Sequence, residues 1–230
     1  MGYHALNIGQ YETYTSNNFV EKTCEKDVFP LISANLEETD PSVSCIQKYI
    51  VQEINGIRIG VTGILPDISK SPLFNANFKC ADPTTSLKEI IPELQKKSDF
   101  IILLSEFDSK QTIEIMNNFS NIDIALCVDT KPVEITNPST VKVMSITNRG
   151  KEIGIIKVEK TDSAVIVKNI RRVSLDNAVE SDPAIESMVK NAMEELERKK
   201  QADKMRISRK KHLEILKLTP EEFIKQYNKN

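Results

Sequence analysis

The apolar and polar residues of this chain repeat with the periods of strands and helices. Continuous apolar runs, typical of strands buried on both faces, cover residues 100–104 and 122–128. Alternating runs, typical of half-buried strands, cover residues 46–53 and 141–146. Further strands are expected at residues 3–8, 31–36, 57–64, 153–159 and 164–173.

Helical spacing appears between these strands. Residues 83–97 carry apolar side chains on one face, with Pro92 interrupting the pattern, and residues 109–119 predict a second helix. Asn55-Gly56, between two apolar runs, is a strong signal for a tight hairpin. Strands alternate with helices and are followed by a run of strands. This order predicts an α/β fold in which one mixed sheet is flanked by helices and a hairpin.

The character of the sequence changes near residue 177. Asp182-Pro183 has the form of a helix cap followed by proline in the first turn. Thr219-Pro220 is expected to open a last short helix. We therefore expect a folded domain at residues 1–176 and a basic, helical appendage at residues 177–230.

Composition narrows the class of protein. With 40% hydrophobic and 28% charged residues, the chain resembles ordinary globular proteins. Its net charge of -2 argues against a general or sequence-specific nucleic-acid binder. No run approaches the roughly 20 apolar residues of a transmembrane helix, and no secretory signal opens the sequence. The four cysteines contain no C-x-x-C pair, and we expect all of them to be reduced.

One segment departs strongly from the average charge. Between Arg198 and Lys211 the chain carries eight basic side chains and a single acidic one, Asp203. This run predicts either a dock for an acidic protein or anionic surface, or simply the solvated side of a long helix. The basic residues are Arg198, Lys199, Lys200, Lys204, Arg206, Arg209, Lys210 and Lys211.

Several phrases resemble one protein family. Residues 1–12 read M-G-Y-H-A-L-N-I-G-Q-Y-E, which is similar to "M-G-Y-D-A-x-x-x-G-N-H-E" of the calcineurin-like metallophosphoesterases, in the branch of the 5'-nucleotidases and 2',3'-cyclic phosphodiesterases. Residues 29–35 resemble the "F-P-x-L-x-A-N" phrase that follows in that branch. Residues 55–64 and 150–159 resemble two later passages. The resemblance implies a metallophosphoesterase β-sandwich flanked by helices and lacking its first strands.

Members of this family hydrolyse phosphate esters with a water held between two divalent metal ions. The positions that the family uses are substituted here. Gln10 stands in place of a metal-binding Asn, Tyr11 in place of the catalytic His, and Glu106 in place of a strand-end His. Asp129 falls within the segment that replaces the family's G-H-x-H motif. The chain's two histidines, His4 and His212, fall at none of these positions.

The substitutions leave two interpretations of the strand ends. Gln10, Glu106 and Asp129 are remnant positions that either hold a hard cation through oxygen atoms or are solvated residues of a decayed site. Tyr11 and Glu12 face the same region, where Tyr11 either stacks on a ring of a ligand or packs at the sheet edge. We expect no catalytic residue and no bound cofactor.

Two functions remain open from the sequence. The first is a 5'-nucleotidase-like domain without phosphatase activity, kept as a scaffold for binding or assembly. The second is part of a nucleotide phosphoesterase whose missing metal ligands lie in an absent N-terminal segment. Taken as written, the sequence indicates a cytoplasmic protein; an upstream segment with a signal would instead indicate the periplasm or the extracellular space.

Overall fold

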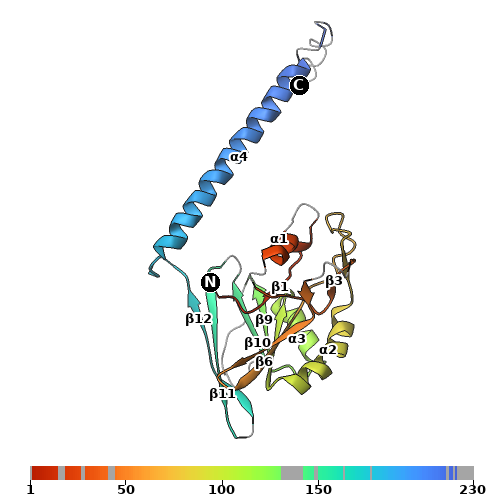
Figure 1. Cartoon of the computed structure of the whole chain (residues 1–230), viewed down its shortest axis with the longest axis vertical. Coiled ribbons are helices and arrows are strands. Elements are labelled where there is room, and N and C mark those ends of the chain that lie inside the picture. The colour runs from red at the N-terminus through yellow and green to blue at the C-terminus, as the bar shows by residue number, and fades with distance from the viewer. Residues whose placement is uncertain are drawn as a thin grey trace. The chain divides into compact units, whose positions relative to one another are not determined.

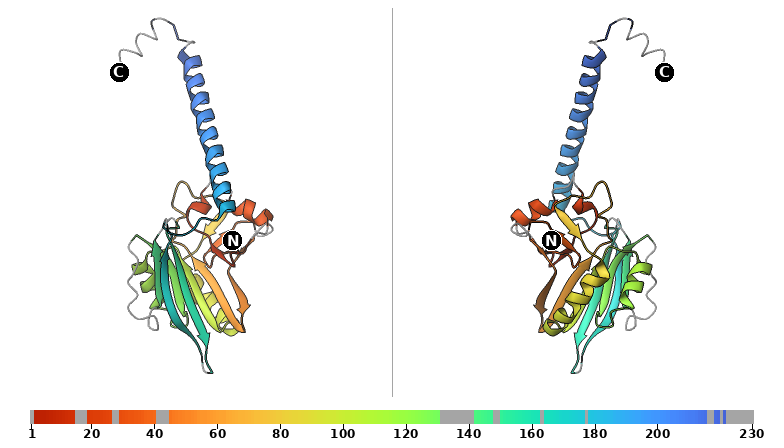
Figure 2. Two further views of the ribbon diagram at one scale, coloured as in Figure 1. Left: turned by 90° about the vertical axis from the view of Figure 1, so that its left-hand side faces the viewer. Right: turned by 90° about the vertical axis from the view of Figure 1, so that its right-hand side faces the viewer.

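A computed structural model describes residues 2–14, 19–26, 29–40, 45–130, 142–147, 150–162, 164–176, 178–215, 218–219 and 221. The chain divides into two compact units, Met1–Asp176 and Asn177–Asn230. The first unit contains the sheets and three helices, and the second contains one long helix (Figures 1 and 2). Each unit is described by itself below.

The first unit is built on a five-stranded sheet with the order β10-β9-β8-β6-β5. Its strands are β5 (Tyr49–Ile54), β6 (Ile57–Ile64), β8 (Phe100–Ser105), β9 (Ile124–Asp129) and β10 (Val143–Thr147). All neighbours are parallel except β5 and β6, which are antiparallel. The carboxyl ends of β6, β8, β9 and β10 therefore lie at one edge of the sheet, where open α/β sheets bind ligands.

The tight turn between β5 and β6 follows directly from the sequence. Asn55 and Gly56 both have positive φ angles, 53° and 75°. Glycine and asparagine tolerate this left-handed conformation, which a two-residue hairpin turn of type I′ requires at both positions. The predicted hairpin is confirmed.

Two helices cover one face of the central sheet (Figure 1). Helix α2 (Pro83–Lys97) begins after Asp82, whose side chain accepts a hydrogen bond from the backbone N–H of Thr85. Helix α3 (Ser109–Met116) begins after Asp108, which accepts from the N–H of Gln111 in the same way. Helix α2 continues through Pro92. Its buried side chains pack on the sheet and are Leu87, Ile90, Ile91 and Leu94.

A β-hairpin covers part of the opposite face (Figure 2). Strands β11 (Glu152–Lys160) and β12 (Val165–Ser174) are antiparallel. The hairpin buries Ile170 in one cluster with Phe100 and Ile124 of the central sheet. The layers are helices, mixed sheet and hairpin, so the predicted α/β fold is confirmed.

A smaller parallel sheet has the order β1-β2-β4. Its strands are β1 (Leu6–Asn7), β2 (Leu31–Ile32) and β4 (Ile46–Gln47). Helix α1 (Phe19–Lys26) and the 3-10 turn η1 (Tyr11–Thr13) lie between β1 and β2 in the sequence. Ile8, Leu31 and Leu36 belong to a second buried cluster.

The predicted strand at residues 31–36 divides into two elements. After β2, the N–H of Ser33 bonds to the carbonyl of Gln47, and that of Ala34 bonds to the carbonyl of Gly63 in β6. The chain then enters β3 (Leu36–Glu38), which pairs with β7 (Phe78–Cys80) in a separate two-stranded sheet. The segment therefore passes from one sheet to another.

Asn35 lies fully buried at this crossing and connects three segments. Its Nδ2 donates to the carbonyls of Leu65 and Ala81 at 2.8 and 3.1 Å, and its Oδ1 accepts from the N–H of Leu65 at 3.0 Å. The N–H and carbonyl of Leu65 and the carbonyl of Ala81 lie outside the strands. Without Asn35 these groups would lack a hydrogen bond, which lowers the stability of the fold. Asn35 thus stabilises the junction between the residue 31–38 segment and the loop after β6.

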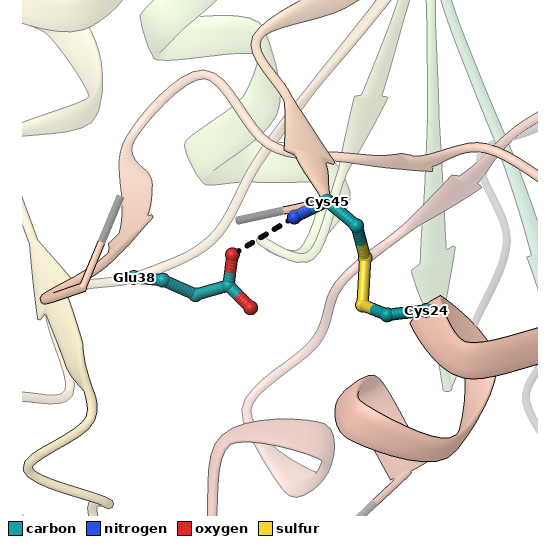
Figure 3. Close-up of a disulfide and its surroundings, with 3 residues drawn as sticks. All are labelled: Cys24, Glu38 and Cys45. Carbon is teal, nitrogen blue, oxygen red and sulfur yellow. Dashed lines mark hydrogen bonds between the residues drawn. A yellow bond between two sulfur atoms is a disulfide. The ribbon is translucent and has the colours of Figure 1, made fainter. Parts of the chain in front are cut away.

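The structure pairs Cys24 of α1 with Cys45, which precedes β4, in a disulfide (Figure 3). Their Cα atoms are 5.8 Å apart, and the Oε2 atom of Glu38 accepts a hydrogen bond from the N–H of Cys45 at 3.0 Å. Cys80 and Cys127 are free thiols. The expectation of four reduced cysteines is therefore wrong for Cys24 and Cys45. Spacing along the sequence does not reveal a pair that only the fold brings together.

The second unit contains helix α4 (Pro183–Ile215). The described side chains of this helix are exposed, including the basic residues from Arg198 to Lys210. Asp182 accepts hydrogen bonds from the N–H groups of Ala184 and Ile185 and so caps the helix. None of the described helices combines the length and apolar character that crossing a bilayer requires. Most of the predicted helix after Thr219 lies outside the described residues.

Candidate functional site

The polar residues predicted to lie at strand ends follow three strands. Gly9 and Gln10 come soon after β1, Glu106 directly follows β8, and Asp129 is the last residue of β9. The strands β8 and β9 are parallel neighbours, while β1 belongs to the smaller sheet and contacts β6. The fold therefore places these residues at one end of the first unit, and their side-chain directions decide which of them meet.

Glu106 meets the turn after β1. Its Oε1 atom accepts a hydrogen bond from the backbone N–H of Gln10 at 2.8 Å. Glu12, in the η1 turn, accepts from the N–H of Gly9 at 3.1 Å. A methyl group on Gly9 would lie only 2.8–2.9 Å from oxygens of both carboxylates. Gly9 is therefore needed here for close approach, and it brings two carboxylates to one turn.

Burial changes the acid strength of Glu106. Desolvation raises the pKa of its carboxyl, the N–H of Gln10 lowers it, and the negative charge of Glu12 raises it; together these effects bring the pKa to about 7. The Oε2 atom is buried and has no hydrogen-bond partner among the described residues. A carboxyl with one free, buried oxygen and a pKa near neutrality is able to hold a proton or accept a donor from a ligand.

This raised pKa predicts a loss of stability as the pH rises. Because the unfolded chain ionises Glu106 near its ordinary pKa of 4.5 and the folded chain only near 7, the contribution is complete below pH 4.5 and disappears as pH rises through 7. We expect the free energy of unfolding to fall by about 1–2 kcal/mol over this range, after allowance for solvent screening. Urea titrations at several pH values measure this.

The matched variant is Glu106→Gln, which keeps the size of the side chain and cannot ionise. Its free energy of unfolding should lack the Glu106 contribution, so the difference between the two proteins should change between pH 4.5 and 7.5. Parallel pH profiles for the two proteins would contradict the assignment of a raised pKa to Glu106.

Asp129 points toward a different surface. Its Oδ2 atom accepts hydrogen bonds from the N–H of Ser109, at 3.1 Å, and from the Ser109 hydroxyl. Because side chains alternate along β9, Asp129 shares the face of Cys127, which packs beneath the helices. The structure brings Gln10, Glu12 and Glu106 together and places Asp129 at the start of α3.

Tyr11 lies on the surface of the η1 turn. Its side chain is 64% exposed, and its ring meets the edge of Tyr14 with the centroids 5.5 Å apart. An exposed ring supported by a second aromatic presents a face to solvent, as rings that stack on ligands also do. The carboxylates of Glu12 and Glu106 both lie close to Gly9, in the turn just before Tyr11.

A cavity of about 470 Å³ opens beside Gly9 and Glu106. Glu106, Gly9 and Asn7 belong to its lining. Asn7 was not predicted as a site residue. Its Nδ2 donates to the carbonyl of Ile64, whereas its buried Oδ1 has no partner among the described residues. The apolar lining consists mainly of Leu6, Leu104, Leu126, Val128, Met144, Ile146 and Ile156.

The donors at this site do not fit a pair of metal ions. No group of three or more His, Cys, Asp or Glu side chains in the described part of the chain is arranged to hold one ion. His4 is exposed before β1, and His212 lies on α4 in the other unit. One carboxylate oxygen each of Glu106 and Glu12 accepts a hydrogen bond from a backbone N–H group. This arrangement favours hydrogen bonding over coordination of a cation at these two oxygens.

Comparison with known proteins finds sequence similarity to 5'-nucleotidases. The chain is 29% identical over 119 residues to a 5'-nucleotidase of Vibrio cholerae, which covers 50% of this chain and 22% of that protein. No protein-family model matches. The match to the Vibrio cholerae protein spans about a fifth of that protein's length.

Solved structures show the same fold. A Staphylococcus aureus protein assigned as a 5'-nucleotidase superposes with a TM-score of 0.67 at 14% identity, covering 84% of this chain and 42% of that one. The NAD nucleotidase of Haemophilus influenzae superposes with a TM-score of 0.61 at 19% identity, covering 76% and 40%. At these identities the similarity establishes the fold, and the function needs a separate argument.

Proposed function

Because the chain belongs to the calcineurin-like metallophosphoesterase superfamily, with 5'-nucleotidases as its sequence relatives, we propose that residues 1–176 form a nucleotidase-like domain that binds a partner without hydrolysing phosphate esters. One observation carries this proposal. The resemblance places a metal-binding Asn, the catalytic His and a strand-end His of the family where this chain has Gln10, Tyr11 and Glu106, and Glu106 accepts a hydrogen bond from a backbone N–H.

The chemistry of hydrolysis supports the same conclusion. Attack on a phosphate ester at neutral pH needs an activated water and a positive environment for the phosphoryl oxygens. The turn after β1 instead brings the negative charge of Glu12 beside the carboxyl group of Glu106, which adds a second negative charge as the pH rises through 7. Like charges at this turn would repel a phosphate group, so the geometry disfavours the family's substrates at this place.

Phosphate release from 5'-AMP and p-nitrophenyl phosphate tests the proposal. With Mn²⁺, Zn²⁺ or Mg²⁺ added, we expect no release above the buffer rate and no effect of a chelator. The Vibrio cholerae relative, purified in the same way, serves as the positive control. Turnover that a chelator abolishes, at a rate well above that of a sample passed through mock purification, would overturn the proposal.

A second candidate is a hydrolase segment completed by metal ligands that lie outside this sequence. Two of the three buried side-chain atoms that have no hydrogen-bond partner among the described residues, Asn7 Oδ1 and Glu106 Oε2, favour it, because an additional segment would supply their missing contacts. Because this chain alone would lack those ligands, the assay separates the candidates when it is repeated with the missing segment supplied: chelator-sensitive turnover then supports the hydrolase, and its absence supports the binding domain.

A further inference from the structure

One face of the central sheet is covered along only part of its length. The hairpin β11–β12 packs over Phe100 and Ile124. Further along the same strands and on the same face, Leu104 and Val128 line the cavity instead. Val128 is 49% exposed although it ends an apolar run inside the sheet. An apolar surface of this kind at the end of a sheet marks a place where another apolar group packs.

The wall of this cavity is an open strand edge. The N–H groups of Leu6 and Ile8 bond to the carbonyls of Pro30 and Ile32, so these residues face β2. The alternate residues Ala5 and Asn7 direct their backbone groups away from β2, and both line the cavity. Among the described strands, β1 pairs only with β2. Open edges of this kind accept an added strand.

Two residues that line the cavity also carry a buried acceptor atom without a donor in the described part of the chain. Asn7 Oδ1 and Glu106 Oε2 are both buried, and neither has a hydrogen-bond partner among the described residues. Both residues belong to the lining of the same cavity. A buried acceptor without a donor is destabilising, so a ligand that brings an N–H group to one of these side chains gains affinity.

We propose that this cavity, together with the free edge of β1, is a groove that binds an extended strand of another polypeptide. Main-chain groups of that strand pair with Ala5 and Asn7, alternate apolar side chains pack on Leu104 and Val128, and a lysine or other N–H donor reaches Glu106. The inference rests on the binding role proposed above and names its partner.

An extended peptide fits these features better than a small molecule does. Only a backbone offers donors and acceptors at the repeat of a strand edge, as well as side chains every second residue on one face. The lining is mainly apolar, and its charged group is an acid, which selects against nucleotides and for a basic side chain.

The test uses a fluorescent nine-residue peptide in which valine and threonine alternate and the central threonine is replaced by lysine. Fluorescence anisotropy against the full chain should give saturable binding. Replacing the lysine with norleucine should weaken binding by about fivefold or more, because the charged contact with Glu106 is lost. A peptide N-methylated at alternate residues on its pairing edge should not bind, because it cannot donate to β1.

Matched variants of the protein locate the site. Val128→Asp should weaken binding about tenfold or more, whereas Ile113→Asp should change it less than about twofold. Ile113 is a similarly exposed apolar residue, at 42%, but it lies on α3. Thermal unfolding shows whether Val128→Asp remains folded. Ala5→Pro, which removes a backbone donor from the edge, is the second variant and should also weaken binding.

Several outcomes would overturn the inference. Saturable peptide binding that is unaffected by Val128→Asp and by Ala5→Pro would place the peptide elsewhere. Displacement of the peptide by 5'-AMP would identify a nucleotide as the occupant, and self-association that Val128→Asp abolishes would identify a second copy. Absence of peptide binding would end the inference without restoring phosphatase activity, so its failure is distinct from that of the proposed function.

Discussion

Replacing Asn35 with alanine is expected to lower the free energy of unfolding by about 3 kcal/mol. The side chain is fully buried and makes hydrogen bonds to Leu65 and Ala81. Its loss leaves the N–H of Leu65 and the carbonyls of Leu65 and Ala81 without these partners, in addition to a cavity. Urea-induced unfolding followed by circular dichroism measures the change.

Asn118 provides the matched control. Its Nδ2 also donates to backbone carbonyls, those of Glu114 and Ile115, but the side chain is exposed at the end of α3 and water replaces the lost bonds. We expect Asn118→Ala to cost less than about 0.5 kcal/mol. If the two alanine variants lose similar stability, Asn35 does not hold the junction as described.

Removal of the disulfide between Cys24 and Cys45 is expected to lower the free energy of unfolding by about 3 kcal/mol. The bond closes a loop with a sequence separation of 21, and it ties α1 to the strand β4. The open chain is less constrained when unfolded, so unfolding becomes more favourable. Differential scanning fluorimetry of the Cys24→Ser/Cys45→Ser variant should show a lower melting temperature.

The free cysteines separate this effect from general thiol chemistry. Cys80 is partly buried and forms no disulfide, so the melting temperature of Cys80→Ser should respond to a reductant as the unaltered protein does. The double variant, in contrast, should not respond to a reductant at all. An unaltered protein whose melting temperature is the same with and without reductant would show that the bond does not contribute.

The strands of the core were predictable because their signal is local. The apolar runs at 100–104 and 122–128 correspond to β8 and β9, which the helices cover on one face and the hairpin covers along part of the other. Helix α2 was also predicted with its bounds, even though Pro92 lies inside it. Leu87, Ile90, Ile91 and Leu94 are buried against the sheet, and this packing outweighs the loss of one helical hydrogen bond.

Features that depend on distant segments could not be predicted in this way. The crossing at residues 33–35 divides an apolar run because Ala34 bonds to β6 and not to a continuing partner of β2. The disulfide joins a helix to a strand of another segment. In both cases the residues are visible in the sequence, but only the fold determines which residues pair with them.

The site was predicted as a set of positions, and the structure determines their contacts. The turn after β1 and the end of β8 were identified from the residue types that follow each strand, and Gln10 does contact Glu106. The direction of Asp129 follows from alternation along β9, which places it beside Ser109. Asn7 carried no signal, because an asparagine within a short strand is not distinctive; only its buried, unpartnered oxygen marks it.

The proposed groove and the substituted strand-end positions lie at the same edge of this domain. Glu106 belongs to both, since the resemblance places a family histidine at its position and the residue lines the apolar cavity. Binding of a strand would satisfy the Oε2 atom of Glu106 and cover Val128, whereas binding of metal ions would need further donors at the same place. The two uses of this edge of the fold are therefore chemically different.

Metal content after incubation with excess Zn²⁺ or Mn²⁺ tests the central claim most directly. Residues 1–176 should retain well under about one ion per chain after gel filtration, as measured by inductively coupled plasma mass spectrometry, because the donors at this site do not converge. The Vibrio cholerae relative provides the loaded control. Retention of about two ions per chain, lost on substitution of Glu106 by alanine, would contradict the claim.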